Sequence, residues 1–283
     1  MSHDHLRTIH FHNGRLRLTA SCGGDGAAPC VVFLHGGGQT RHSWNSSALD
    51  LLRTGYRVLS LDLRGHGDSD WAENGDYRLD AQIGDLLTVL AKLPTPPVLV
   101  GASLGGLVAL GCAGEHPGIA KALVLVDVTP KVDAQGAARV KQFMQANPDG
   151  FASFAEAADA IAAYLPHRPR RADTSGLRRN LRLRNGRYYW HWDPRLFDTL
   201  DTSSHAPQSR YERAAAGLEL PTLLIRGARS ELVASEHVEH FLKLLPTARH
   251  VDVQDAGHMV AGDSNEAFSH ALKEFLAEVA PLP

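Results

Sequence analysis

The sequence has few cysteines and no long apolar segment. No apolar run approaches the roughly 20 residues that cross a bilayer, and the segment from Met1 to Arg7 lacks the apolar centre of a secretory signal. The three cysteines, Cys22, Cys30 and Cys112, cannot all pair within one chain, and none belongs to a Cys-x-x-Cys motif. We therefore expect a soluble, cytoplasmic protein with reduced thiols and no membrane partner.

An excess of charge of one sign is also missing. The 29 lysine and arginine residues nearly balance 31 aspartate and glutamate residues, which leaves a net charge of −2 at pH 7. A strongly basic chain would favour nucleic acid or an anionic membrane surface as a partner. This balance favours neither, and we expect no nucleic-acid partner.

Histidines occur at two places that resemble functional sites. The amino-terminal residues of metal-ligating type lack a second cluster at metal-site spacing, so we expect no metal site. These residues are His3, Asp4, His5, His10 and His12. His66 lies in the segment Arg64 to Ser69, which we interpret as a tight turn after a strand rather than as part of a catalytic site.

Short apolar runs dominate the rest of the chain, which at 283 residues and 43% hydrophobic content can bury a large core. Runs that are apolar on both faces occur at residues 30–34, 56–61, 98–100, 122–126, 222–225 and 250–253. Such runs are typical of a parallel sheet covered on both sides, and segments of helical period lie between them. Two further strands flank the Asn13-Gly14 pair, which favours a hairpin turn. The sequence predicts an α/β fold with a mostly parallel eight-stranded sheet and helices on both faces.

One interval is too long for a single crossover, because about ninety residues separate Val126 from the run that begins at Thr222. Residues 155–165 are rich in alanine, and residues 177–183 carry apolar side chains at helical spacing. We interpret residues 128–218 as an inserted helical cap, and residues 1–127 and 219–283 as the core. The cap is expected over the carboxyl ends of the strands, where open α/β sheets bind ligands.

Two features of the predicted cap bear on substrate binding. Trp190 and Trp192 stand at alternate positions, so both rings can close a substrate pocket or can pack the cap onto the core. A group of arginines makes the region basic, which is typical of a solvated surface and would alternatively attract an anionic substrate. They are Arg168, Arg170, Arg171, Arg178, Arg179, Arg182, Arg184 and Arg187.

A Gly-x-Ser-x-Gly motif spans Gly101 to Gly105, directly after the apolar run 98–100 and before a helix-like segment at 106–113. The pattern predicts a strand, a tight turn with Ser103 at its apex, and a helix. Glycines at both ends let strand and helix approach closely while the serine backbone is strained. An ordinary Gly-Ser turn is the alternative. We interpret Ser103 as a candidate nucleophile.

A serine nucleophile needs a base, and the base needs a carboxylate to orient it. His258 lies in the loop after the last predicted strand, and Glu231 lies in the loop after the strand that ends at Ile225. The order serine, acid, histidine is that of serine-elbow hydrolases. Asp127, at the end of another apolar run, is the alternative acid.

These residues resemble the α/β-hydrolase family with a cap. The matching segments are His35 to Gly38 with Trp44 beyond it, Asp62 to Ser69, Gly101 to Gly106, Gly227 to Glu231, and Gly257-His258. They cover the predicted core and not the cap. The resemblance implies Ser103 as nucleophile, His258 as general base and then acid, and Glu231 as the orienting carboxylate. Most relatives carry aspartate at that acid position, and some have their acid at the position of Asp127.

Attack on a carbonyl places negative charge on its oxygen, which backbone N–H groups can stabilise. Leu104 begins the predicted helix, so its N–H lies at the positive end of the helix dipole. The resemblance implies Gly37 as the second donor, with Gly38 as a close alternative. Gly38, Trp190 and Trp192 are also candidate substrate-binding residues.

The sequence thus predicts a serine hydrolase that cleaves a carboxylic ester or lactone through an acyl-enzyme, with a small-molecule substrate and no cofactor. Carbon–carbon bond hydrolysis and cofactor-free perhydrolase activity on the same triad are alternatives. A non-catalytic ligand receptor is less favoured, because all members of a triad are present. Epoxide hydrolase and dehalogenase activities are disfavoured, because in those enzymes the elbow normally carries aspartate.

Overall fold

The computed structural model describes residues 5–165, 173–199, 205–263 and 265–282. His3, Asp4, Arg168, Arg170 and Arg171, which the sequence analysis singled out, lie outside these ranges. In the described part of the chain, no helix combines the length and the apolar character needed to span a bilayer.

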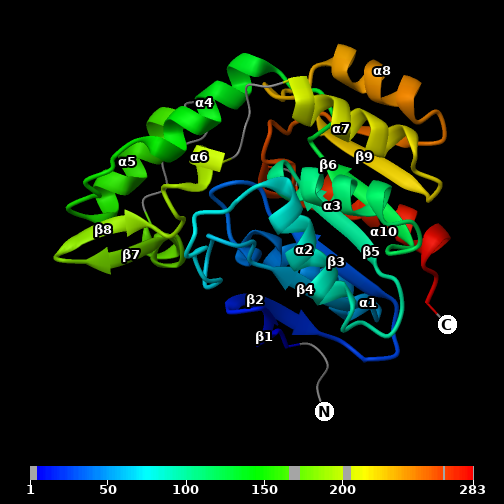
Figure 1. The fold of residues 1–283 in the computed structure, drawn as a ribbon, viewed down its shortest axis with the longest axis horizontal. Helices are drawn as coiled ribbons and strands as arrows, with labels where there is room; N and C mark the ends of the chain where they lie inside the picture. Colours follow the sequence, from blue (N-terminus) through cyan, green and yellow to red (C-terminus); the bar gives the residue numbers. More distant parts are fainter. Residues whose placement is uncertain (1–4, 166–172, 200–204, 264, 283) are drawn as a thin grey trace.

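A large sheet organises the chain. Its strands are β1 (Arg7–Asn13), β2 (Leu16–Gly23), β3 (Cys30–Leu34), β4 (Arg57–Leu61), β5 (Val98–Ala102), β6 (Ala122–Val126), β9 (Thr222–Gly227) and β10 (Arg249–Val253). They form one eight-stranded sheet in the order β1-β2-β4-β3-β5-β6-β9-β10, drawn in Figure 1. The pairs β1–β2 and β2–β4 are antiparallel, and the other pairs are parallel. The predicted mostly parallel, eight-stranded sheet is confirmed.

Helices cover both faces of the sheet, because successive residues of each buried strand point to opposite sides. Val32 and Leu99 belong to one core cluster, whereas their neighbours Val31 and Val100 belong to the other. The first cluster is closed by α2 (Leu79–Leu90), α3 (Leu104–Glu115), α7 (His205–Ala216) and α8 (Ser235–Leu244). The second is closed by α1 (Asn45–Thr54) and α10 (Asn265–Val279).

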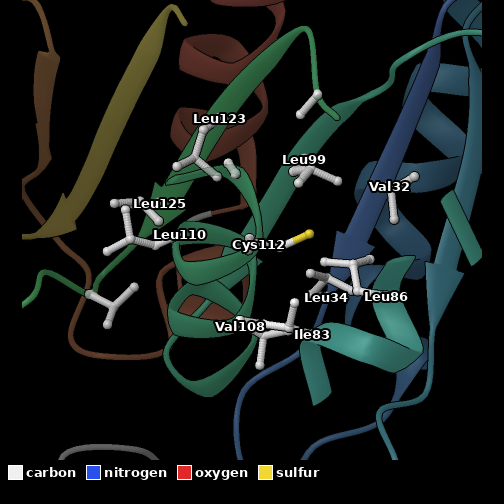
Figure 2. Packing of buried hydrophobic residues seen from close by; sticks show 14 of the residues in the cluster. Val32, Leu34, Ile83, Leu86, Leu99, Val108, Leu110, Cys112, Leu123 and Leu125 are labelled. Carbon is white, nitrogen blue, oxygen red and sulfur yellow. The ribbon is translucent and has the colours of Figure 1, made fainter. Parts of the chain in front are cut away.

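Helix α3 is buried around most of its circumference. Figure 2 shows Val108 and Cys112 of α3 in one cluster with Ile83 of α2 and with Leu99 and Leu125 of the sheet. α3 also contacts α7 along its length, so it has no wide solvent-facing side. This central position fixes the amino end of α3 at the carboxyl edge of the sheet.

β6 and β9 are separated by a long stretch of the chain, which we call the inserted segment. It contains α4 (Ala134–Gln145), α5 (Phe154–Tyr164), the 3₁₀ turn η2 (Ser175–Arg179), β7 (Leu181–Arg184), β8 (Arg187–Trp190), the short α6 (Leu196–Thr199) and α7. α4 and α5 project to one side of the sheet in Figure 1, whereas α7 returns to pack on α3 and α8.

Helix does not extend through residues 177–183, contrary to the expectation from their apolar spacing. Residues 181–184 pair with residues 187–190 as an antiparallel hairpin. Asn185 and Gly186 form its two-residue turn with φ of 49° and 78°, and an Asn-Gly pair suits a turn that needs positive φ at both positions. Alternation in Leu181-Arg182-Leu183-Arg184 favours a strand over a helix.

The inserted segment has a small core of its own, which we call the aromatic cluster. Its buried members are Ala72, Tyr77, Met144, Phe151, Ala157, Leu181, Trp190, Trp192 and Leu196. Trp190 and Trp192 stack at 4.9 Å between ring centroids with planes inclined by 12°. Since Ala72 and Tyr77 come from the core, this cluster also attaches the segment to the rest of the molecule.

Candidate active site

Ser103 stands at the turn between β5 and α3, with a left-handed backbone at φ 46° and ψ −119°. The turn is held by close packing around its glycines. A Cβ on Gly101 would lie 2.5 Å from the Gly105 carbonyl oxygen, and one on Gly105 would lie 2.5 Å from the Leu34 oxygen. Because those contacts admit no side chain, strand and helix approach closely and the serine keeps its unfavourable backbone. The strand–turn–helix predicted for this motif is confirmed.

His258 lies in the loop after β10, and its ring is joined to a buried carboxylate. Its Nδ1 is 2.6 Å from Oδ2 of Asp127, whose side chain is fully buried. The Gly227 N–H donates to Oδ1 at 3.0 Å, and the Ser230 hydroxyl donates to Oδ2 at 2.5 Å. These donors fix the Asp127 carboxylate from two sides, so it is suited to hold the ring of His258 in one orientation.

In the described residues His258 is joined to Asp127 and no contact joins it to Glu231, so the geometry favours Asp127, the alternative acid that the sequence left open. β6 and β9 are neighbours in the sheet, and Asp127 directly follows β6 with its N–H donating to Ile225 of β9. Ser230 takes the position next to Asp127 in the loop after β9. Glu231, one residue later, instead lines the cavity described below.

The loop after β3 brings glycine N–H groups to Ser103. A Cβ on Gly36 would lie 3.3 Å from the Cβ of Ser103. The Gly36 N–H donates to Gln39 and the Gly38 N–H donates to His66, at 3.0 Å and 3.2 Å. Among the described residues, the Gly37 N–H has no acceptor, which leaves it available as a donor and disfavours Gly38 in that role.

Leu104 begins α3 directly after the serine, as the sequence predicted. Its N–H belongs to the first turn of the helix, where backbone donors have no acceptor within the helix. The positive end of the helix dipole adds to the attraction for a negative oxygen there. Leu104 and Gly37 are thus the two candidate donors for an oxyanion formed at Ser103.

Three buried histidines accept backbone N–H groups in the glycine loop and in the turn after β4: His35 accepts from Leu63, His66 from Gly38 and His191 from Gly67. Burial lowers the pKa of His35 to about 4 and that of His66 to about 3, and it holds the pKa of His191 well below the usual range. His66 faces the Arg64 carbonyl with Nδ1, so its Nε2 is free to accept from Gly38. His191 accepts from the Gly67 N–H at 2.8 Å. The prediction that His66 belongs to a structural turn is confirmed.

Ser103 and His258 open into one cavity of about 340 Å³. A volume of this order is typical of small-molecule sites. Apolar side chains of the inserted segment line much of it, including Val140, Phe143, Met144, Ile161, Trp190 and Trp192. Trp190 and Trp192 are also members of the aromatic cluster. Both rings therefore line the cavity and pack the inserted segment, the two roles that the sequence left open. Gly37 and Gly38 line the cavity as well.

Within the described residues, no group of three histidine, cysteine, aspartate or glutamate side chains is arranged to hold a metal ion. His10, from the amino-terminal group, instead contacts the Thr19 hydroxyl through Nδ1 at 3.2 Å.

Comparison with known proteins places these features in context. The sequence profile of the α/β hydrolase fold family matches residues 29–264. The esterase Rv0045c of Mycobacterium tuberculosis is 32% identical over 271 residues, which cover 89% of this chain and 84% of that protein. The sn-1-specific diacylglycerol lipase ABHD11 of Mus musculus is 33% identical over 271 residues, or 90% and 83% of the two chains.

Solved structures show the same fold. A crystal structure of E-2-(acetamidomethylene)succinate hydrolase superposes with a TM-score of 0.85 at 22% identity, covering 96% of this chain and 99% of that one. A structure of the mycobacterial esterase gives a TM-score of 0.76 at 31% identity, with coverage of 96% and 92%.

Proposed function

Because the chain belongs to the α/β-hydrolase family, we propose that it is a serine hydrolase that cleaves a carboxylic ester or a lactone through an acyl-enzyme. The observation that carries this proposal is the 2.6 Å contact between the buried Asp127 and His258, which lines the same cavity as Ser103. Relatives named as an esterase and as a diacylglycerol lipase support hydrolysis of esters.

In the first half of the reaction, His258 Nε2 removes the proton of the Ser103 hydroxyl as Oγ attacks the substrate carbonyl. Asp127 accepts the Nδ1–H and stabilises the imidazolium that forms. The N–H groups of Gly37 and Leu104 donate to the oxyanion. His258 then gives its proton to the leaving alcohol, and the acyl group stays on Ser103.

In the second half, water replaces the alcohol. His258 removes a proton from the water as the water oxygen attacks the acyl carbon, and the resulting oxyanion uses the same two donors. Collapse breaks the bond between the acyl carbon and Ser103 Oγ, which takes its proton back from His258 as the acid leaves. No step requires a metal or a cofactor.

The substrate is a small to medium, partly apolar molecule, because the cavity has about 340 Å³ and largely apolar walls. The inserted segment acts as the cap, with Trp190 and Trp192 against the substrate and Gly38 beside them. The cytoplasm is the proposed location. Three buried, unpaired cysteines support a reducing compartment.

A fluorophosphonate probe tests the nucleophile. The folded protein should be labelled at Ser103, and Ser103→Ala should abolish both labelling and turnover of a 4-nitrophenyl ester. A folded protein that reacts with neither the probe nor the ester would contradict the proposal and favour a non-catalytic receptor.

Paired carboxylate variants test the orienting acid. Asp127→Asn should lower kcat by about 10³- to 10⁴-fold, because the imidazolium loses its partner and the ring its orientation. Glu231→Gln makes the same carboxylate-to-amide change at the residue after Ser230, which contacts Asp127. The kcat of Glu231→Gln should stay at least 100-fold above that of Asp127→Asn. A larger loss in Glu231→Gln would assign the acid to Glu231.

A further inference from the structure

Glu231 lines the cavity with an ionic side chain that takes no part in the proposed reaction. In residues 5–165, 173–199, 205–263 and 265–282, no lysine or arginine lines the cavity. Apart from His258, Glu231 is the one side chain of ionic type in the described lining. The remaining serine, amide and tyrosine side chains of the lining carry no charge at neutral pH: Gln39, Ser43, Ser103, Tyr164 and Asn180.

The backbone of Glu231 is fixed from both sides. Ser230 before it donates to Asp127 and accepts from the N–H groups of the next turn, and Leu232 after it is buried. Helix α4 packs on this stretch so closely that a Cβ on Gly136 would lie 2.4 Å from the Glu231 carbonyl oxygen. The Asp133 N–H donates to the Leu232 carbonyl at 2.8 Å. These contacts therefore hold in place the backbone from which the Glu231 side chain extends.

The negative charge of Glu231 affects the hydroxyl of Tyr164 on α5. Burial raises the pKa of the Tyr164 hydroxyl, and the negative charge of Glu231 raises it further. Arg139 acts on the same hydroxyl in the opposite sense, but its side chain is exposed and does not line the cavity. In the described part of the chain, no hydrogen bond or ion pair neutralises the Glu231 carboxylate. The cavity wall formed by Glu231 and Tyr164 is thus negative.

Resting on the proposed function, we propose that Glu231 is a specificity-determining residue that rejects substrates with a second carboxylate and favours neutral or cationic esters. A carboxylate on the substrate would share a largely apolar cavity with Glu231, where water screens charges poorly. Coulomb repulsion at about 7 Å with an effective dielectric constant of about 20 corresponds to a penalty of roughly 10- to 100-fold in binding. A cationic group gains attraction of the same kind.

The test uses three 4-nitrophenyl esters with acyl chains of equal length, which end in a methyl, a carboxylate or a trimethylammonium group. We expect wild-type kcat/KM to be about 10-fold or more lower for the carboxylate ester than for the methyl ester, and lowest of the three. Glu231→Gln should bring the carboxylate and methyl esters at least 5-fold closer together and lower the preference for the cation. Glu231→Lys should reverse the ranking.

Glu236→Gln is the matched control, since it removes a carboxylate that is 77% exposed nearby in the chain and outside the cavity lining. It should keep the wild-type ranking. A wild-type protein that cleaves the carboxylate ester as fast as the methyl ester overturns the inference without any variant. An unchanged ranking in folded Glu231→Gln and Glu231→Lys overturns it too, whereas failure of the wild type to cleave any ester overturns the proposed function itself.

Discussion

Among single residues, His66 links the turn after β4 to the glycine loop after β3. Its neutral ring accepts the Gly38 N–H, and the ring is fully buried. The neighbouring Gly37 is the proposed oxyanion donor, so the direction of its N–H depends on where the Gly38 backbone is held. His66 is therefore a positioning residue that acts on the reacting oxygen through the loop.

His66→Leu should lower kcat by about 10-fold or more with little change in KM, because a displaced oxyanion donor stabilises the transition state less. It should also lower the free energy of unfolding by about 1–3 kcal/mol, because the part-buried Gly38 N–H loses its acceptor and the ring is fully buried. Steady-state kinetics and urea unfolding measure the two effects.

His66→Gln retains an acceptor and should lose less of both quantities, and His270→Leu on an exposed part of α10 should change neither. If His66→Leu loses stability while kcat is preserved, the ring supports the fold without positioning the donor.

Among the elements, α3 packs closely on the sheet at glycines where a Cβ atom would meet backbone atoms. Gly105→Ala should lower the free energy of unfolding by about 2–4 kcal/mol, because its Cβ would meet the Leu34 and His35 carbonyl oxygens at 2.5 Å and 2.6 Å. Gly26→Ala, where a Cβ meets nothing within 4 Å, should stay within about 0.5 kcal/mol of wild type. Urea unfolding followed by circular dichroism compares them, and similar losses in both would refute the packing argument.

The pattern of apolar residues along the sequence predicted most strands and helices of the core. Runs that are apolar on both faces are compatible with few structures other than a parallel sheet covered on both sides. The pattern failed at residues 177–183, where apolar side chains at helical spacing indicated a helix, whereas the Leu-Arg alternation and the Asn185-Gly186 turn specify a hairpin. In the site, Ser103 and His258 follow from their motifs. The choice between Asp127 and Glu231 does not, because it depends on the adjacency of β6 and β9 and on the place of Ser230.

For the whole molecule, the buried histidines couple stability to pH. Each has an ordinary pKa of 6.5 when unfolded, and burial lowers it to about 4 in His35 and about 3 in His66. Below pH 6.5 the unfolded chain therefore binds protons that the folded chain does not. The stabilisation is complete above this pH and is lost as the pH falls toward the folded values.

The free energy of unfolding should decrease between pH 6.5 and 5, by up to about 1.4 kcal/mol per pH unit for each buried histidine. Urea titrations at several pH values measure this slope. His66→Gln should lower this slope by about the contribution of one histidine, whereas His270→Leu should leave the slope as in the wild type. A stability that is constant over this range would show that the rings are protonated equally in both states.

The double use of Trp190 and Trp192 limits how this enzyme can acquire new substrates. Both rings line the cavity and also hold the inserted segment together, so a change that reshapes the site there also loosens the fold. Glu231 and Asn180 line the cavity from outside the aromatic cluster. Directed evolution toward new esters should therefore accumulate its first tolerated substitutions at these two positions, and changes at the tryptophans should follow only in stabilised backgrounds.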